Sequence, residues 1–140
     1  MRHARRQARE VALQALYAWQ LSGGDPLEEA RANEAYEKSA FLDELVRGVH
    51  GGAAELEKLI APHLDRKFAR LSPVERAILY IGTYELSAHP KTPFKVVLNE
   101  AVELGKSFGG AEGHRFINGV LEKIAEALRP EEVARSRKLV

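Results

Sequence analysis

Hydrophobic residues recur along most of this 140-residue chain at spacings of three and four positions. That spacing places side chains on one face of a helix. Near the N-terminus the pattern produces an apolar stripe: Ala4, Ala8, Val11, Ala12, Ala15, Leu16 and Trp19. The pattern ends at Ser22-Gly23-Gly24, so we predict one amphipathic helix over about residues 1–21.

Helix start signals, an N-cap residue followed by proline, occur at Asp25-Pro26, Ser72-Pro73 and Thr92-Pro93. Ser72 with Glu75 also forms a capping-box sequence. The helical patterns that follow cover about residues 26–38, 41–49, 56–60, 73–86, 93–108 and 116–128. We expect Gly51-Gly52 to end the third helix, so that the fourth is separate.

No segment shows the sustained alternation of a strand, and no Asn-Gly or Asp-Gly turn joins strand-like runs. The chain is therefore predicted to be all-α, with six or seven helices in a single compact unit. We allow for one division, near residues 65–72. Residues 1–130 form the predicted helical domain, and the polar residues 131–140 are expected to be a loose, flexible tail.

The first predicted helix carries Arg2, Arg5, Arg6 and Arg9 on one face, with no acidic residue before Glu10. The positive end of a helix dipole repels cations by about 0.3–1 kcal/mol each. Arginines placed unfavourably with no benefit to folding suggest a polyanionic partner. The arginine guanidinium binds phosphate through two parallel hydrogen bonds. A solvated basic face that only improves solubility is the alternative.

Composition is ordinary for a soluble globular protein, with 45% hydrophobic and 29% charged residues. Because the net charge is only +1, any affinity for nucleic acid has to come from a local concentration of charge. Residues 25–45 hold seven acids against two basic residues, Arg31 and Lys38. This acidic segment suits a basic protein partner or a solvated surface.

Several kinds of chemistry are absent from the sequence. The chain has no cysteine, which excludes thiol nucleophiles, thiolate zinc sites and disulfides. Its five histidines do not have metal-ligand spacing, and no catalytic set of nucleophile and base is recognisable. The glycines Gly109, Gly110 and Gly113 lack the strand and the Lys-Ser/Thr of a P-loop. We therefore expect no enzymatic activity, no metal and no cofactor.

A basic start followed by an apolar run imitates a signal peptide. Glu10, Gln14 and Gln20 interrupt that run, and no other segment approaches the length of a transmembrane span. We therefore expect a cytoplasmic protein that makes no membrane contact.

Aromatic residues lie near cations at three places. Tyr17 follows the arginine face, Lys106 precedes Phe108, and Arg115 precedes Phe116. Single-stranded RNA is bound in this way, because unpaired bases stack on rings while cations hold the backbone. From their spacing alone, Phe108 and Phe116 are better interpreted as core residues.

Four blocks of sequence, in order, resemble the NusB family of transcription antitermination factors: ARRQAREVALQALYAWQL at 4–21, VERAILYIGTYEL at 74–86, PFKVVLNEAVELGKSFG at 93–109 and HRFINGVLEKIA at 114–125. The resemblance implies two packed three-helix subdomains. It also implies binding of boxA-type single-stranded RNA together with the ribosomal protein NusE. With RNA polymerase and further Nus factors, such proteins promote read-through of terminators, notably in ribosomal RNA operons.

By position, the resemblance assigns Arg5, Arg6 and Arg9 to the family's arginine-rich motif, with Tyr17 downstream on the same helix. The candidate RNA-binding residues are therefore Arg2, Arg5, Arg6, Arg9, Tyr17, Lys106, Phe108, Arg115 and Phe116. We expect the three motif arginines to be exposed, so that replacing them together by alanine abolishes RNA binding while the protein stays folded.

Two other functions remain open from the sequence. The same helical domain occurs as an RNA-binding module attached to RNA cytosine methyltransferases. The chain could also be a protein-interaction scaffold, such as a homodimer that buries the arginine helix. A scaffold of that kind would lack salt-dependent RNA binding.

Overall fold

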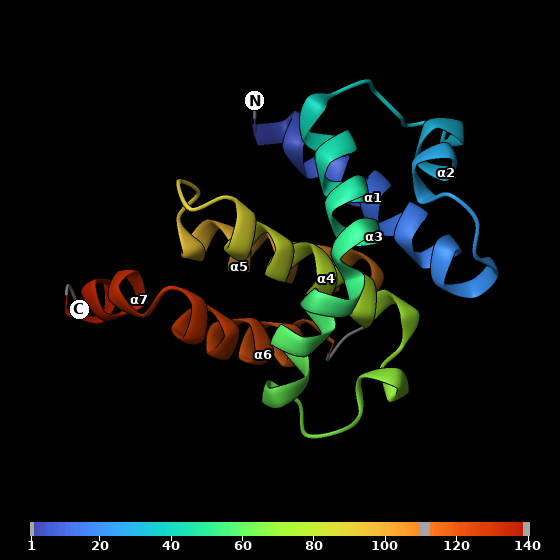
Figure 1. Cartoon of the computed structure of the whole chain (residues 1–140). Helices are drawn as coiled ribbons and strands as arrows, with labels where there is room; N and C mark the ends of the chain where they lie inside the picture. The colour runs from blue at the N-terminus through green and yellow to red at the C-terminus, as the bar shows by residue number, and fades with distance from the viewer. Residues whose placement is uncertain (1, 110–112, 139–140) are drawn as a thin grey trace.

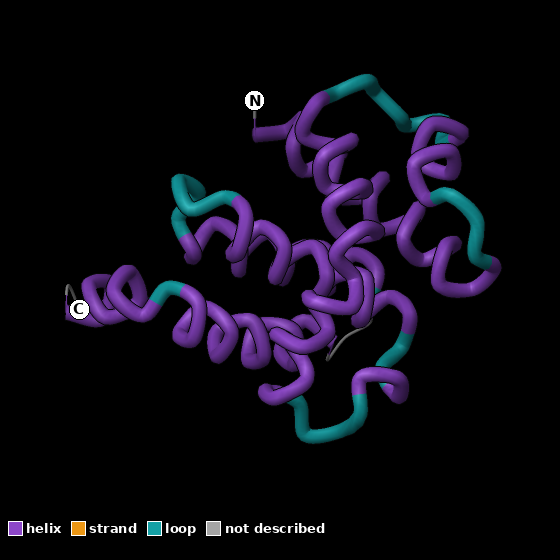
Figure 2. Tube along the Cα trace, in the orientation of Figure 1, coloured by secondary structure: helices purple, strands orange, loops and turns teal. Residues whose placement is uncertain are grey.

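The computed structural model describes residues 2–109 and 113–138, with the side chains of Arg2 and His3 left out. Within those residues the regular structure is entirely helical (Figures 1 and 2). The helices are α1 (Arg2–Ser22), α2 (Pro26–Ala32), α3 (Ala40–Ile60), α4 (Pro73–Ala88), α5 (Phe94–Phe108), α6 (Gly113–Leu128) and α7 (Pro130–Lys138). Two 3₁₀ turns, Ala61–His63 and Phe68–Arg70, lie between α3 and α4. The all-α prediction is confirmed.

Two of the three start signals in the sequence act as caps. The third, Thr92-Pro93, does not, because α5 begins at Phe94 with Pro93 at its N-cap position and no side-chain cap. The Asp25 carboxylate accepts a hydrogen bond from the Leu27 amide. The Ser72 hydroxyl accepts one from the Glu75 amide, and the Glu75 carboxylate accepts one from the Ser72 amide. These bonds satisfy amides that a helix start otherwise leaves without partners.

Helix α4 is central. It contacts α1 and α3 on one side and α5 and α6 on the other, and it lies between the two groups in Figure 1. With α4 counted in the second group, the chain forms two three-helix subdomains, α1–α3 and α4–α6, and α4 is the helix that joins them. Their buried residues form one continuous hydrophobic core, to which α4 contributes Ala77, Ile78, Leu79 and Ile81.

Three helix boundaries differ from the predictions. Helix α2 ends at Ala32 rather than near Lys38. The break predicted at Gly51-Gly52 is present as a kink: Gly52 has non-helical dihedral angles (φ −110°, ψ 15°), and a second helical segment continues α3 beyond it to Ile60. Val49 before the kink and Leu56 and Ile60 after it are buried, so core packing holds the two halves in one helix.

The expected loose tail from Glu131 is the third difference, because residues Pro130–Lys138 form α7. Val133 of this helix is buried. The Glu132 carboxylate accepts a hydrogen bond from the Phe94 amide at 2.8 Å, and Pro93 at the start of α5 provides no side-chain cap. Helix α7 therefore caps α5, a contact between segments that the sequence gives no reason to pair.

Arg129, just before α7, holds the connection between α4 and α5. Its guanidinium donates hydrogen bonds to the carbonyls of Glu85, Leu86, His89 and Thr92, at 2.6–3.2 Å. These carbonyls belong to the end of α4 and the segment that follows it, so the side chain fixes the path of residues 89–92.

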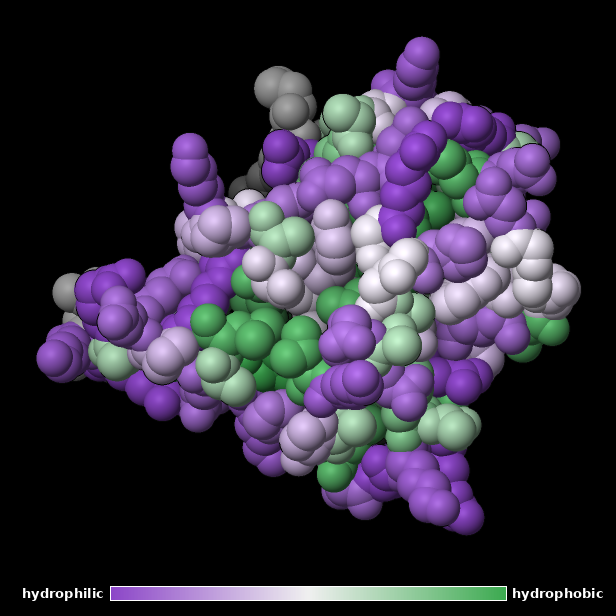
Figure 3. Space-filling model, in the orientation of Figure 1, coloured by the Kyte–Doolittle hydropathy of each residue, from purple (hydrophilic) through white to green (hydrophobic). Residues whose placement is uncertain are grey.

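Apolar side chains gather over α5 and α6 on the face shown in Figure 3. A hollow of about 320 Å³ between α5, α6 and α7 is lined by Phe94, Leu98 and Val133, with polar side chains around it. In the part of the chain that the structure describes, no helix is long and apolar enough to cross a membrane.

Candidate nucleic-acid interface

The arginine face lies where α1 crosses α4 and α5. Arg9 of α1 pairs with Glu85 in the last turns of α4, and Gln20 donates to the Pro73 carbonyl at the start of α4. Helices α1 and α4 therefore run in opposite directions, with the N-terminal turns of α1 beside the α4–α5 connection. No acidic residue lies in the first turn of α1.

Arg5 is exposed. Its guanidinium carbon lies 4.6 Å from the centre of the Phe41 ring, at the start of α3. A guanidinium over an aromatic face is attracted by the ring quadrupole, and at an exposed site this contributes about 0.5–1 kcal/mol. The contact holds Arg5 in place without neutralising its charge, so Arg5 remains able to bind an anion.

Arg6 is partly exposed and paired. Its guanidinium donates two hydrogen bonds to the Glu100 carboxylate of α5, at 3.1 and 3.0 Å. These hydrogen bonds and the attraction of the Glu100 charge raise the pKa of Arg6 above its ordinary value. With 38% of its side chain exposed, Arg6 presents to solvent a charge that Glu100 already compensates.

Arg9 is buried, which contradicts the expectation that all three motif arginines are exposed. Only 4% of Arg9 is accessible. Its guanidinium donates two 2.8 Å hydrogen bonds to Glu85, which is 1% exposed. A second carboxylate, that of Glu100, lies 3.5 Å from Arg9 Nη1.

The burial of Arg9 changes what we expect of the variant in which Arg5, Arg6 and Arg9 are all replaced by alanine. Removing one partner of a buried ion pair leaves an uncompensated charge in the interior, which is strongly destabilising. Alanine at Arg9 leaves Glu85 in that condition. The triple variant is therefore expected to be less stable than wild type, and a loss of RNA binding by it would not separate RNA contact from destabilisation at Arg9.

The sequence carried a signal for Glu85. It is a single carboxylate inside the very apolar helix pattern of residues 77–86, and buried carboxylates need a partner. Which cation serves as the partner depends on how α1 crosses α4, and spacing along one helix contains no information on that crossing.

Tyr17 lies further along α1 and is 39% exposed. Leu21, one turn later, is 60% exposed. The exposed side of α1 therefore carries arginines near its start and an aromatic and an apolar side chain near its end. The backbone of Arg2 begins α1, and its side chain lies outside the described residues.

The remaining predicted site residues lie around the α5–α6 connection. Phe108 is 37% exposed at the end of α5, and Lys106 pairs with Glu103 at 3.5 Å. On α6, Arg115 is exposed and Phe116 is partly buried. Arg66 lies over the Phe116 ring at 5.0 Å.

Phe108 lies on α5 well away from Glu100, the residue of α5 that Arg6 contacts. Phe108 lies eight residues after Glu100, the partner of Arg6, which corresponds to about 12 Å along a helix. The structure thus brings Arg5, Arg6 and Arg9 together, whereas Phe108 at the end of α5 and Phe116 near the start of α6 lie on either side of the α5–α6 connection. Gly110, between these aromatic residues, lies outside the described residues.

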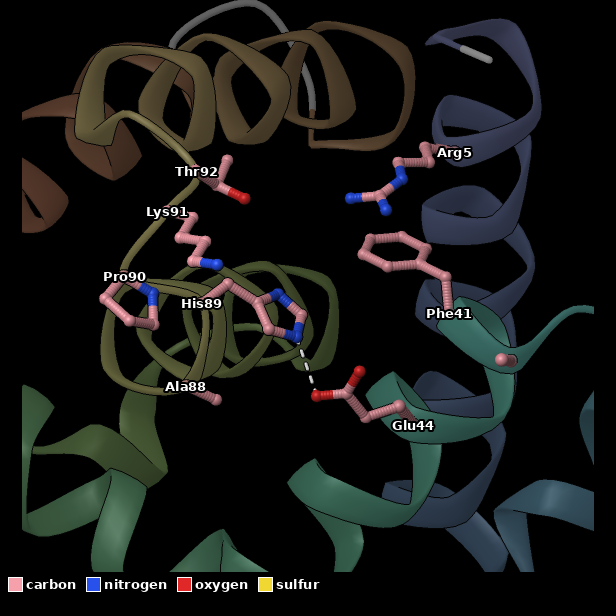
Figure 4. Close-up of a pocket in the computed structure, with 9 residues that line it drawn as sticks. Arg5, Phe41, Glu44, Ala88, His89, Pro90, Lys91 and Thr92 are labelled. Atoms are coloured by element: carbon pink, nitrogen blue, oxygen red, sulfur yellow. Dashed lines mark hydrogen bonds and ion pairs between the residues drawn. The ribbon is translucent and has the colours of Figure 1, made fainter.

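A cavity that the sequence did not predict opens beside Arg5. Its volume is about 460 Å³, and it is lined by Phe41, Glu44, His89, Lys91 and Thr92 together with Arg5, Ala40, Ala88 and Pro90. Figure 4 shows Arg5 and Phe41 on one side and His89, Lys91 and Thr92 on the other, with Glu44 below them. Phe41 and Glu44 were part of an ordinary helix pattern in the sequence.

Glu44 accepts two hydrogen bonds on one oxygen, Oε2: from the Tyr84 hydroxyl at 2.8 Å and from His89 Nε2 at 2.6 Å. Burial alone would raise the pKa of Glu44, but these hydrogen bonds and the nearby charges hold it below its ordinary value. Burial and the bond to Glu44 raise the pKa of Tyr84 to about 12. The carboxylate is therefore held in its ionised form.

Within the described residues, no group of three or more His, Asp or Glu side chains is arranged to hold a metal ion. Around the N-terminal half of α1 the structure offers exposed cations, aromatic rings and the exposed carboxylate of Glu44, while Glu85 and Glu100 are buried and paired with arginines. These groups can bind a polyanion and contact bases.

A family model and individual relatives both match this chain to NusB proteins. The model of the NusB family matches residues 6–126. The transcription antitermination protein NusB of Burkholderia mallei (strain SAVP1) is 48% identical over 139 residues, which covers 96% of this chain and 96% of that protein. The protein of the same name from Burkholderia thailandensis is also 48% identical over the same shares.

Solved structures agree with these relatives. The T. maritima NusB structure has a TM-score of 0.82 and 29% identity, and the match covers 93% of this chain and 96% of that one. The crystal structure of antitermination factors NusB and NusE in complex with dsRNA contains a chain with a TM-score of 0.80 and 28% identity. That match covers 91% of this chain and 99% of the other.

Proposed function

This chain belongs to the NusB family, and on that premise we propose that the N-terminal turns of α1 form its RNA-binding surface. The protein acts in transcription antitermination. It binds boxA-type single-stranded RNA together with ribosomal protein NusE and, with RNA polymerase and other Nus factors, promotes read-through, notably of ribosomal RNA operons. The observation that carries this function is the 48% identity to NusB proteins over nearly the whole chain.

The three arginines of this surface have different roles. Arg5 contacts the RNA directly, because it is exposed and its described interactions, the contact with the Phe41 ring and the attraction to the Glu44 charge, leave its N–H donors available. Arg6 contributes in part, since Glu100 already holds two of its donors. Arg9 has a positioning role: its buried pair with Glu85 fixes the N-terminal half of α1 against α4.

Tyr17 extends this surface along α1, where an exposed ring can stack on an unpaired base. Phe108, Lys106, Arg115 and Phe116 form a second contact region at the α5–α6 connection. Arg2 lies at the start of α1, in continuity with Arg5. RNA that contacts both regions follows the molecule from the start of α1 to the end of α5.

We also infer that the protein works by binding and not by catalysis, and that it does so in the cytoplasm. Antitermination requires an assembly around the transcribing polymerase, and the groups near Arg5 hold and orient a ligand. A homodimer that buries α1 is incompatible with this role, because it would cover Arg5.

The test compares two single variants, Arg5→Ala and Arg135→Ala. Arg135 is an exposed arginine of α7, so its replacement removes the same charge away from the proposed surface. We expect Arg5→Ala to weaken binding to boxA-type RNA about tenfold in a fluorescence anisotropy titration, and Arg135→Ala to change it less than twofold. Equal affinities of the two variants would contradict the assignment of the surface to α1.

A further inference from the structure

We propose that the cavity between α1, α3 and the α4–α5 connection is a nucleobase subsite. One unpaired base of the bound single-stranded RNA enters it, stacks on the Arg5–Phe41 pair and donates a hydrogen bond to Glu44. This inference rests on the proposed RNA-binding function and adds to it a specific pocket with residues that the sequence did not single out.

The stacking surface is formed by Arg5 and Phe41. The guanidinium of Arg5 lies over the Phe41 ring, and both border the cavity (Figure 4). His89 extends the surface, with its ring centre 5.9 Å from that of Phe41. Bases in single-stranded RNA stack on aromatic rings and on guanidinium planes alike, so this surface fits the face of any base.

The hydrogen-bond partner for the base edge is Glu44. Its Oε2 is occupied by Tyr84 and His89, whereas Oε1 takes part in no hydrogen bond among the described residues. The side chain is 47% exposed, and its pKa is held below the ordinary value. An ionised carboxylate only accepts hydrogen bonds, so it selects a base that presents an N–H donor, such as an exocyclic amino group.

The charges at the mouth of the cavity favour the phosphates of the RNA backbone on either side of the base. Arg5 and the exposed Lys91 lie on opposite sides of the mouth, with the Thr92 hydroxyl nearby. Two cations flanking one carboxylate favour phosphates next to a base with a polar edge. A basic protein partner would be repelled by the same two cations, which favours RNA over protein as the occupant.

The fold holds the walls of the cavity in a defined position. Arg129 fixes residues 89–92 through four carbonyls, and the Tyr84–Glu44–His89 hydrogen bonds join α3 to the end of α4. The volume of about 460 Å³ lies within the range of about 300–1,000 Å³ that small ligands occupy. The site therefore exists before a base enters.

The experiment uses the full chain, two variants and a set of RNAs. Glu44→Gln keeps the shape of the side chain and an acceptor for Tyr84 while removing the charge. Phe41→Leu keeps an apolar residue at the start of α3 and removes the ring. The RNAs are one boxA-type strand and a series of the same strand in which one nucleotide at a time is abasic.

We expect each variant to bind the intact strand about five- to twentyfold more weakly than wild type. One abasic position should weaken binding to wild type by a similar factor and have no further effect on the variants, because the base and the residues act on the same contact. Arg135→Ala should leave every affinity within twofold. Thermal unfolding checks that each variant is folded. If Phe41→Leu does not fold, the result for Glu44→Gln alone tests the subsite.

Several outcomes would overturn the subsite. One is wild-type affinity of both variants while Arg5→Ala still weakens binding, a result that leaves the proposed function intact. Another is loss of affinity that is the same for every abasic strand. Loss of NusE binding with unchanged RNA binding would assign the cavity to a protein. Absence of RNA binding by wild type would refute the proposed function itself.

Discussion

At the residue scale, two carboxylates inside the molecule, Glu85 and Glu100, determine how the arginines of α1 are placed. Glu85 pairs with Arg9, and Glu100 lies within reach of both Arg6 and Arg9. Two cations and two anions thus share a small, largely buried region. Such a cluster stabilises the fold only while its charges stay matched.

Replacing Arg9 by alanine tests this balance. We expect Arg9→Ala to lower the free energy of unfolding by about 3–5 kcal/mol, because Glu85 remains charged and buried. Arg5→Ala, which removes only an exposed cation–π contact, should lower it by at most about 1 kcal/mol. Urea unfolding followed by circular dichroism measures both values. If Arg9→Ala were as stable as Arg5→Ala, the assignment of Arg9 as a positioning residue would be wrong.

A double variant separates the charge from the packing. Replacing Arg9 by Met and Glu85 by Leu removes both charges and keeps apolar volume, and buried pairs replaced in this way are often neutral in stability. We expect the double variant to recover most of the stability that Arg9→Ala loses.

Tyr84 links stability to alkaline pH. Its folded-state pKa of about 12 lies above the ordinary value of 10.0, so the folded protein holds the hydroxyl proton more tightly than the unfolded chain. The stability that Tyr84 contributes is complete below pH 10 and is lost as the pH rises through about 12. Tyr84→Phe lacks this group, so the stability gap between wild type and variant should shrink between pH 10 and 12. A gap that stays constant from pH 8 to 12 in urea unfolding would contradict the linkage.

At the element scale, α3 and α4 approach closely where Gly48 faces the ring of Tyr84. A Cβ at Gly48 would overlap that ring, so the glycine permits the approach that brings Tyr84 and Glu44 together. The same interface positions one wall of the cavity. The sequence contains no sign of this requirement, because a glycine in a helix pattern lowers helix propensity wherever it occurs.

Alanine at Gly48 and at Gly119 should have opposite effects. Gly48→Ala should destabilise the protein by about 1–3 kcal/mol, since the overlap with Tyr84 forces the helices apart. A Cβ at Gly119 of α6 would meet no neighbouring atom within 4 Å, so Gly119→Ala should stabilise by up to about 1 kcal/mol through helix propensity. Thermal unfolding of the two variants tests the sign, and a stabilising Gly48→Ala would be inconsistent with the close approach.

At the scale of the whole molecule, a net charge of +1 gives no general attraction for RNA. Binding has to come from the cationic end of α1 and from stacking along it. Phosphate contacts with a single strand weaken with salt, with a slope of roughly −0.7 per contact, whereas base stacking adds about 1–3 kcal/mol per base with less salt dependence.

A boxA-type strand should therefore outcompete a scrambled strand of equal length, and the difference should persist at raised salt. Tyr17→Ala should reduce this difference more than it weakens binding to the scrambled strand, because the ring contributes stacking and no charge. Competition titrations at two salt concentrations measure both effects. Parallel loss of affinity for the two strands, with neither preferred, would mean that sequence recognition belongs to a partner.

The sequence alone determined most of the helices, the caps at Asp25 and Ser72 and the cationic end of α1. These depend on neighbours within a few positions: the apolar spacing of the core residues, the Ser72–Glu75 capping box and the arginine run. The same reasoning failed after Pro130, because burial of Val133 outweighed a local polar signal. At Gly52 it gave the interruption of the helix, but not that the second segment continues α3 across a kink.

Only the tertiary structure decided which arginine is exposed and where a base can enter. Arg9 and Glu85 are 76 positions apart, and Glu44 and His89 are 45 apart. Their meeting depends on the crossing of α1, α3 and α4. The packing of the whole core sets that crossing. The hydrophobic effect stabilises any contact that removes apolar surface from water, whatever the separation of the two residues along the chain. Local spacing therefore placed four arginines on one face, and the fold turned one of them into the core and left another beside a cavity.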